Sequence, residues 1–316
     1  MQQKNVIAVV GPTASGKTAL AIALARHFDG EILSADSMQI YRGMDIATAK
    51  ATPQERREAV HHLIDIAGFD ENYSVAKFTA LAQQTIAQIT ARGKIPILAG
   101  GTGLYVSSIL DGIRFVPMEN DPAYRKELSE LARQDGEGPL REELGRIDPE
   151  SARRIAANDI KRLIRALEVY HVTGKTLSYF HARSRPETPP YRACILALSC
   201  RERQYLYERI NRRVEQMFAA GLVDEVRALM DQGFGKKATT ASRAIGYRQV
   251  IAYLKGEITL EQAKESIKQE TRRYAKRQLS WWRREERAHT LEIDILPEFD
   301  ALVQKAVEIV AKELCL

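Results

Sequence analysis

The sequence is poor in cysteine and contains no long apolar run. The chain has 316 residues and three cysteines, Cys194, Cys200 and Cys315, and no two of them form a C-x-x-C pair. This pattern argues against both a zinc site and a disulfide framework, so we expect reduced thiols in a cytoplasmic protein. No apolar run approaches the roughly 20 residues that cross a bilayer, and the N-terminus leads directly into a strand pattern. We therefore expect neither a membrane span nor a signal peptide.

Positive charge is present in excess, and it is concentrated late in the chain. The net charge is +6, and residues 201–290 carry 20 Lys and Arg against 12 Asp and Glu. Residues 1–200 carry 25 against 23, and residues 291–316 carry 2 against 6. This asymmetry indicates a polyanionic partner. A solvated helical face produces the same excess, so charge alone leaves a nucleic-acid partner undecided.

A phosphate-binding motif lies at the N-terminus. The pattern G-x-x-x-x-G-K-[ST] is met by Gly11, Gly16, Lys17 and Thr18, after the apolar run 6–10 and before an Ala/Leu-rich helical pattern. Such a loop turns successive backbone N–H groups toward one anion, and the following helix presents its positive end. Lys17 adds a positive charge and Thr18 an oxygen for Mg²⁺. The motif predicts phosphate binding, but it does not say whose phosphate is bound.

The spacing of apolar runs predicts an α/β fold with a P-loop NTPase-like parallel sheet and helices on both faces. Helical patterns separate the strand candidates, and the clearest spans 74–92 with Ser74 as its N-cap. Because ligands bind beyond the carboxyl ends of parallel strands, Gly11–Thr18, Asp36 and Gly100–Gly103 are expected at one edge of the sheet. The strand candidates are 5–11, 31–36, 94–101 and 193–200.

Short helical patterns with clear stops predict an all-helical insertion domain at 112–190. Asp121-Pro122, Asp148-Pro149 and Asn158-Asp159 are typical helix starts. The proline-rich stretch 183–191 would be the return linker. The α/β core would then comprise 1–111 and 191–316, and its last part would form helices at 201–220, 222–232, 241–255 and 259–288.

Several residues outside the loop could serve chemistry. Asp36 ends a strand on the ligand edge, where its carboxylate could hold Mg²⁺ through water or accept a proton, although strand-end aspartates also cap turns. Thr102 in "GGTG" could contact an anion, or the segment could be only a tight turn. His61 and His62 have no partner ligands at metal-site spacing, so we interpret them as structural.

Three later segments could contact nucleic acid. Residues 158–169 place Lys161, Arg162 and Arg165 on one helix, and the face they form could be merely solvated. Gly246 lies inside a helical pattern, which suggests close approach of another group. The stretch 271–287 mixes aromatic side chains with seven Lys and Arg, which suits phosphates and unstacked bases. Its two tryptophans could equally be core residues.

Taken in order, the motifs resemble the tRNA dimethylallyltransferase (tRNA isopentenyltransferase, or IPP transferase) family along nearly the whole chain. Two departures are small: Ala47 stands where glycine is usual, and Val60 where proline often precedes the paired histidines. The resemblance is to the short bacterial type, in which no C-terminal zinc finger follows. It rests on "GPTASGKT", "SADSMQIYRGMDIATAK", "HHLIDI", "GGTGLYV", "NDIKRLIRALEV", "SRAIGYRQV" and "TRRYAKRQLSWWR".

The resemblance implies transfer of a prenyl group from dimethylallyl diphosphate to the exocyclic N6 amine of the adenosine 3′-adjacent to the anticodon, with release of diphosphate. Asp36 would orient that amine and take its proton, and Lys17, Thr18 and Thr102 would complete the catalytic set with Mg²⁺ held near Thr18. The insertion would grip the anticodon arm of the tRNA, and the protein would act as a monomer. The diphosphate would be held by Gly11, Pro12, Thr13, Ala14, Ser15, Gly16, Lys17 and Thr18, and Arg209 and Arg213 could complete the clamp.

The same resemblance implies a set of tRNA-contacting positions. They fall in three segments and at two single residues: Asp36, Ser37, Met38 and Gln39; Thr102; Arg125; Lys161, Arg162, Leu163, Ile164 and Arg165; and Arg243, Ala244, Ile245, Gly246, Tyr247 and Arg248.

Other functions remain open on the sequence. A small-molecule or nucleoside kinase would share the phosphate loop, the edge carboxylate and a helical lid, but it would not explain the basic, aromatic helix. A prenyltransferase acting on free adenine nucleotides would have little use for a basic insertion. A non-catalytic RNA-binding protein would not need an intact phosphate loop together with Asp36.

Overall fold

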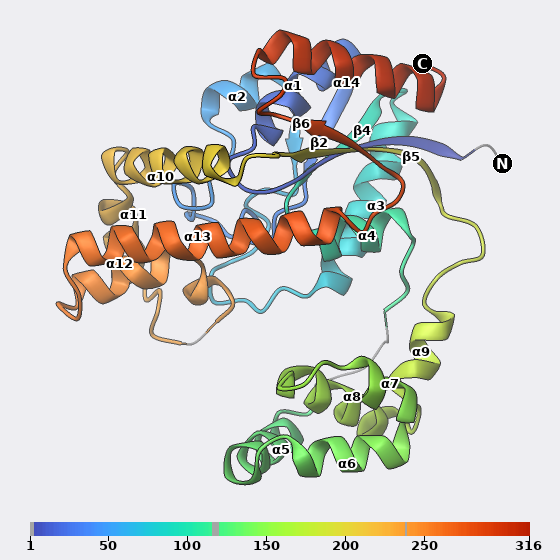
Figure 1. Ribbon diagram of the computed structural model, residues 1–316, viewed down its shortest axis with the longest axis vertical. Helices are drawn as coiled ribbons and strands as arrows, with labels where there is room; N and C mark the ends of the chain where they lie inside the picture. Colours follow the sequence, from blue (N-terminus) through green and yellow to red (C-terminus); the bar gives the residue numbers. More distant parts are fainter. Residues whose placement is uncertain (1–2, 116–119, 238) are drawn as a thin grey trace. The chain divides into compact units, whose positions relative to one another are not determined.

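The computed structural model describes residues 3–115, 120–237 and 239–316 (Figure 1). Residues 1–2, 116–119 and 238, which belong to the expected core and insertion, lie outside this described part. The chain divides into two compact units, one formed by residues 1–110 and 190–316 and the other by residues 111–189. Within the described ranges, no helix combines the length and apolarity needed to cross a bilayer.

The first unit is built on a parallel sheet of six strands in the order β3-β2-β4-β1-β5-β6. This arrangement confirms the predicted α/β fold. The central strand β1 is fully apolar in its last five residues, as expected for a strand covered on both faces. The strands are β1 (Lys4–Val10), β2 (Gly30–Ser34), β3 (His61–His62), β4 (Ile95–Gly100), β5 (Tyr191–Ser199) and β6 (Ala288–Glu292).

Helices cover both faces of the sheet, and each face has its own apolar core. Ile7 and Val9 of β1 pack on the side of α1 (Lys17–His27) and α14 (Phe299–Leu314). Val6, Ala8 and Val10 point to the opposite side, toward α3 (Val75–Ala91) and α4 (Gly103–Leu110). Figure 1 shows these two helix layers above and below the strands. The remaining helices are α2 (Pro53–Glu58), α10 (Arg203–Ala219), α11 (Leu222–Asp231), α12 (Tyr247–Leu254) and α13 (Leu260–Trp282).

Two predicted helices are wrong in their bounds. The pattern at 241–255 is divided into a 3₁₀ turn, Ala241–Arg243, and α12, because Gly246 has φ +96° and can only precede the helix. The pattern at 259–288 ends at Trp282 and is followed by the edge strand β6. The charged residues that follow Trp282 have helical propensity, but residues from Ala288 onward pair with the parallel strand β5. β3 was not predicted because two residues carry no periodic signal.

The second unit consists of five helices in its described part. Aspartates cap three of them: Asp121 accepts from Tyr124 N, Asp148 from Ser151 N and Asp159 from Arg162 N, at 3.0 to 3.2 Å. Leu128, Leu140, Leu144, Leu163 and Leu167 form most of its core. The helices are α5 (Pro122–Asp135), α6 (Gly138–Ile147), α7 (Pro149–Arg154), α8 (Ile160–Thr173) and α9 (Leu177–Arg183).

Candidate active site

The phosphate loop follows β1 and ends at the N-terminus of α1. Gly11 has φ +139°, and a Cβ there would lie 2.6 Å from the carbonyl oxygen of Leu198, so only glycine fits. Gly16 caps α1 with φ +95°. The Lys17 ammonium donates a 2.6 Å hydrogen bond to the carbonyl of Pro12. The lysine is therefore held across the loop, where its charge faces the anion-binding backbone.

Three ionisable groups meet next to this loop. Burial and the nearby Arg213 guanidinium lower the pKa of Lys17 to about 7, against the opposing influence of Asp36. Burial raises the pKa of Asp36, although the Met38 N–H, Lys17 and Arg213 counteract the increase. Burial likewise lowers the pKa of Arg213 despite the Asp36 carboxylate. Strongly perturbed groups that perturb one another are typical of a functional site.

Helix α10 supplies both expected clamp arginines. The Nε of Arg209 donates a 2.8 Å hydrogen bond to the carbonyl of Ala14, in the middle of the loop. Its Nη2 atom lies 3.9 Å from the position of a Cβ on Gly16. Arg213 is one helical turn further along, so both guanidinium groups lie on one face of α10. The structure thus brings residues 195 positions apart into direct contact at the phosphate loop.

The side of the site opposite α10 is formed by residues that follow β2 and β4. Asp36 lies two residues beyond β2, and its Oδ1 accepts a 2.8 Å hydrogen bond from Met38 N. The Ser37 N–H donates to Thr102 Oγ1 at 3.1 Å, and Thr102 N donates to the Ala35 carbonyl at 3.3 Å. The two segments are close enough that a Cβ on Gly100 would lie 2.3 Å from the Ala35 oxygen. Asp36 and Thr102 are consequently neighbours.

Sequence reasoning missed Gln278, which joins the two sides of the site. This α13 side chain is buried; its Oε1 accepts from Thr13 N at 2.9 Å and its Nε2 donates to the Gly101 carbonyl at 3.0 Å. One turn earlier, Tyr274 lies beside Thr102 and Gln278, and burial together with Asp36 raises the pKa of its phenol. The only signal in the sequence was a glutamine on the buried face of a basic helix.

The two tryptophans of α13 have different environments. Trp282 is 5 % exposed and belongs to the core. Trp281 is 44 % exposed, and its indole lies against Gly103, where a Cβ would be 2.4 Å from Nε1. The structure thus decides between the two interpretations separately for each tryptophan. Trp282 is a core residue, whereas Trp281 lies partly at the surface beside the N-terminus of α4.

The segment after Asp36 is fixed by hydrogen bonds of Gln39 and of Glu225, a residue that the sequence did not single out. The Gln39 amide accepts from Ser34 Oγ at 2.7 Å and donates to the carbonyls of Thr48 and Ala49, so it is occupied within the protein. Glu225 on α11 accepts from Asp45 N, Ile46 N and the Tyr247 hydroxyl at 3.1, 2.9 and 2.6 Å.

Only part of the segment 243–248 reaches the surface. Arg243 and Arg248 are exposed, Ile245 is half-buried, and Ala244, Gly246 and Tyr247 are buried. The group that approaches Gly246 is the side chain of Ala47, whose Cβ would be 2.6 Å from a Cβ at position 246. Arg248 also forms an ion pair with Glu270.

In the helical unit, the expected contact positions also divide by exposure. Lys161 and Arg162 are exposed, whereas Leu163 and Ile164 are buried in the core of the unit and present no side chain to a ligand. Arg165 and the expected residue Arg125 are partly exposed, and both bind the buried carboxylate of Glu168.

Each of the paired histidines contacts an oxygen atom within the core unit. His62 Nε2 lies 2.7 Å from Glu31 Oε2, and His61 Nδ1 lies 2.8 Å from the Ala59 carbonyl. In residues 3–115, 120–237 and 239–316, no group of three or more His, Cys, Asp or Glu side chains could hold a metal ion.

Comparison with known proteins places this site in a family. A family model described as IPP transferase matches residues 39–285, and one described as isopentenyl transferase matches residues 4–65. The tRNA dimethylallyltransferase of Carboxydothermus hydrogenoformans is 48 % identical over 287 residues, covering 91 % of each chain. That of Geobacillus thermodenitrificans is 44 % identical over 311 residues, covering 98 % of each chain.

Solved structures agree with the sequence comparison. The tRNA isopentenylpyrophosphate transferase of Bacillus halodurans has a TM-score of 0.73 at 40 % identity, and the alignment covers 99 % of this chain and 97 % of that one. A eukaryotic dimethylallyltransferase acting on tRNA has a TM-score of 0.81 at 28 % identity, over 96 % of this chain and 77 % of that one. The chain belongs to the IPP transferase family, that of the tRNA dimethylallyltransferases.

Proposed function

We propose that the protein transfers a dimethylallyl group from dimethylallyl diphosphate to the N6 amine of the adenosine 3′-adjacent to the anticodon of tRNA, and that the donor diphosphate binds in the loop Gly11–Thr18. The observation that carries this assignment is the grouping of Lys17, Arg213 and Asp36, which shift one another's pKa beside the loop that Lys17 and Arg209 bind. The positive charges would stabilise the departing diphosphate, and the carboxylate would accept the proton of the adenine amine.

The reaction breaks the allylic carbon–oxygen bond, and its electron pair leaves with the diphosphate. Negative charge therefore grows on the bridging oxygen as the bond lengthens. Lys17, Arg209 and the loop N–H groups would be fixed in place before the reaction, which is how such donors stabilise a transition state best. The hydrogen bonds of Lys17 to Pro12 and of Arg209 to Ala14 support this fixed placement.

The amine nitrogen forms the new bond to the allylic carbon and must lose one proton. Asp36 would accept it, since burial raises the pKa of this carboxyl and makes it a better base. Thr102, held beside Asp36 through Ser37, would help to orient the adenine. The base must leave its stack to reach this site, which costs a few kcal/mol. Phosphate contacts elsewhere on the protein would offset that cost.

Magnesium fits the loop as a companion of the diphosphate. Mg²⁺ is usually held by phosphate oxygens and waters with one or two protein oxygens, not by an all-protein cage. The Thr18 hydroxyl, in the first turn of α1, would be that protein oxygen. When bound, the ion would supply positive charge to the departing diphosphate.

The tRNA would be held by exposed cationic side chains. Lys161 and Arg162 of the helical unit and Arg243 and Arg248 of the core unit support this proposal by their exposure, and Arg165 is partly exposed. The protein would act as a monomer. Since tRNA is the acceptor, we place the protein in the cytoplasm.

The direct test is product formation. Incubation with dimethylallyl diphosphate, Mg²⁺ and unmodified tRNA should yield N6-dimethylallyladenosine in the digested tRNA, detected by nucleoside mass analysis. Matched incubations with ATP and no tRNA should show no ATP turnover. ATP turnover without tRNA, together with an unmodified tRNA, would favour the kinase.

We also expect tRNA affinity to depend steeply on salt. Neutralising several phosphates releases counterions, so affinity should fall by about 10³-fold between about 50 and about 200 mM salt. Fluorescence anisotropy with a labelled anticodon stem-loop measures this slope. A flat response would remove the cationic surfaces from the binding site.

A further inference from the structure

We propose that Glu168 is a positioning residue for tRNA: it fixes the guanidinium groups of Arg125 and Arg165 so that their remaining N–H groups face RNA phosphate. This inference rests on the proposed tRNA binding by the helical unit. The resemblance to known enzymes pointed to the two arginines, but not to the carboxylate between them.

The Glu168 side chain is fully buried, and both of its oxygens accept hydrogen bonds. Oε1 accepts from Arg125 Nε at 2.6 Å and from Asp121 N at 3.0 Å. Oε2 accepts from Arg125 Nη2 and from Arg165 Nη1, both at 2.8 Å. Burial alone would raise the pKa of Glu168, but the hydrogen bonds from Arg125 and Arg165 keep that pKa below its ordinary value. A charged carboxylate therefore binds two arginines from two helices, α5 and α8.

The arginines themselves are not buried. The side chains of Arg125 and Arg165 are 41 % and 37 % exposed, while that of Glu168 is 0 % exposed. A guanidinium has five N–H groups in a planar arrangement. Arg125 uses Nε and Nη2 inward, the latter also toward Asn120 Oδ1 at 2.9 Å, which leaves Nη1 without a partner in the part of the chain that the structure describes. Arg165 uses Nη1 toward Glu168, which leaves Nε and Nη2.

This arrangement matters because a free arginine loses rotamer entropy when it binds phosphate. An arginine already held by a carboxylate has lost most of that freedom on folding, so less is lost per phosphate contact formed. The two charges of Arg125 and Arg165 also remain in excess of the single charge of Glu168. The cluster thus presents one net positive charge in a fixed orientation, next to the exposed Lys161 and Arg162.

The substitution Glu168→Gln separates orientation from charge. It raises the net charge by one, so an effect of charge alone would strengthen RNA binding. If Glu168 positions the arginines, affinity for the anticodon stem-loop should instead fall about tenfold, and the salt slope should decrease by about one unit. The KM for tRNA should rise while kcat and the KM for dimethylallyl diphosphate stay unchanged, because the donor loop belongs to the other unit.

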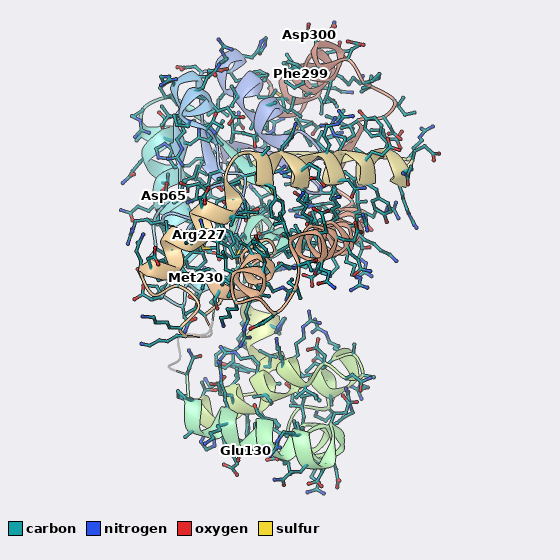
Figure 2. All side chains as sticks on the ribbon, turned by 90° about the vertical axis from the view of Figure 1, so that its left-hand side faces the viewer. Asp65, Glu130, Arg227, Met230, Phe299 and Asp300 are labelled. Carbon is teal, nitrogen blue, oxygen red and sulfur yellow. The ribbon has the colours of Figure 1, made fainter. Side chains whose placement is uncertain are left out.

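Glu130→Gln is the matched control. Glu130 lies on α5, is exposed and points outward in Figure 2, and its ion-pair partner among the described residues is Lys126 at 3.9 Å. It makes the same change in net charge and should leave affinity at or slightly above that of the wild type. A second variant, Arg125→Lys, keeps the charge and leaves no buried carboxylate unpaired, but loses the two-point contact with Glu168. It should also weaken RNA binding.

The outcomes distinguish the two proposals. Wild-type affinity in both Glu168→Gln and Arg125→Lys overturns the positioning role and leaves tRNA binding by this unit intact. If Lys161→Ala and Arg162→Ala also bind as tightly as the wild type, the unit does not hold RNA, and the proposed function of the unit fails as well. Thermal melting shows whether Glu168→Gln is folded; if it is not, Arg125→Lys decides.

Discussion

Replacing Asp36 by asparagine should lower kcat about 10³-fold while tRNA affinity stays close to that of the wild type. The amide has the same shape and can still accept the hydrogen bond from Met38 N, but it cannot take the proton from the adenine amine. Removing a general base typically costs about 10²- to 10⁴-fold in rate. Single-turnover transfer with saturating tRNA and dimethylallyl diphosphate measures the change in the chemical step.

Asp29→Asn is a suitable control for this variant. Asp29 immediately precedes β2, at the opposite end of the strand that leads to Asp36, and its partner Lys94 lies 2.6 Å away at the surface. Transfer by Asp29→Asn should match the wild type. Full activity in Asp36→Asn would exclude Asp36 as the proton acceptor and leave the base to be sought among its neighbours.

Replacing Lys17 by glutamine should lower kcat/KM for dimethylallyl diphosphate by about 10²- to 10³-fold, the usual effect of losing one fixed donor to a developing anion. In the wild type, burial and Arg213 lower the pKa of Lys17 to about 7. A cation with a lowered pKa loses its charge as pH rises, and kcat/KM reports the free enzyme. We therefore expect kcat/KM for the donor to fall as pH increases above about 7.

The substitution Lys17→Arg keeps the positive charge at this position but removes its titration near neutral pH. A guanidinium stays protonated throughout this pH range, so the decrease above about pH 7 should disappear in this variant even if its maximal activity is lower. The measurement is kcat/KM for dimethylallyl diphosphate between about pH 6 and about pH 9 in both proteins. If the decrease remains in Lys17→Arg, a different group is titrating, and Lys17 is charged throughout in the wild type.

The phosphate loop could be predicted because its signal is local. Gly11, Gly16, Lys17 and Thr18 are close in sequence, and the strand before them and the helix after them are both strongly patterned. The edge of the sheet where Asp36 and Thr102 lie also followed from the alternation of strands and helices. Parallel strands end at the same edge, so their positions relative to the loop needed no side-chain information.

The contacts that complete the site could not be predicted because they are long-range and use ordinary residues. Gln278 lies 265 positions from Thr13, and nothing in its neighbourhood distinguishes it from a surface glutamine of a basic helix. Glu168 looked like one more charged residue on α8. Its spacing of three from Arg165 was visible, but its burial depends on Arg125 of a different helix.

The Gln278 contact also has a consequence for the stage of synthesis at which the enzyme can become active. Thr13 is among the first residues to leave the ribosome, whereas Gln278 is synthesised when more than four-fifths of the chain already exists. Until then the loop lacks its link to Gly101, and the central strand β1 has no β5 beside it until residues 191–199 are made. A nascent chain, or one truncated before Gln278, therefore carries the complete motif without this contact, and we expect competence to arise only near the end of translation.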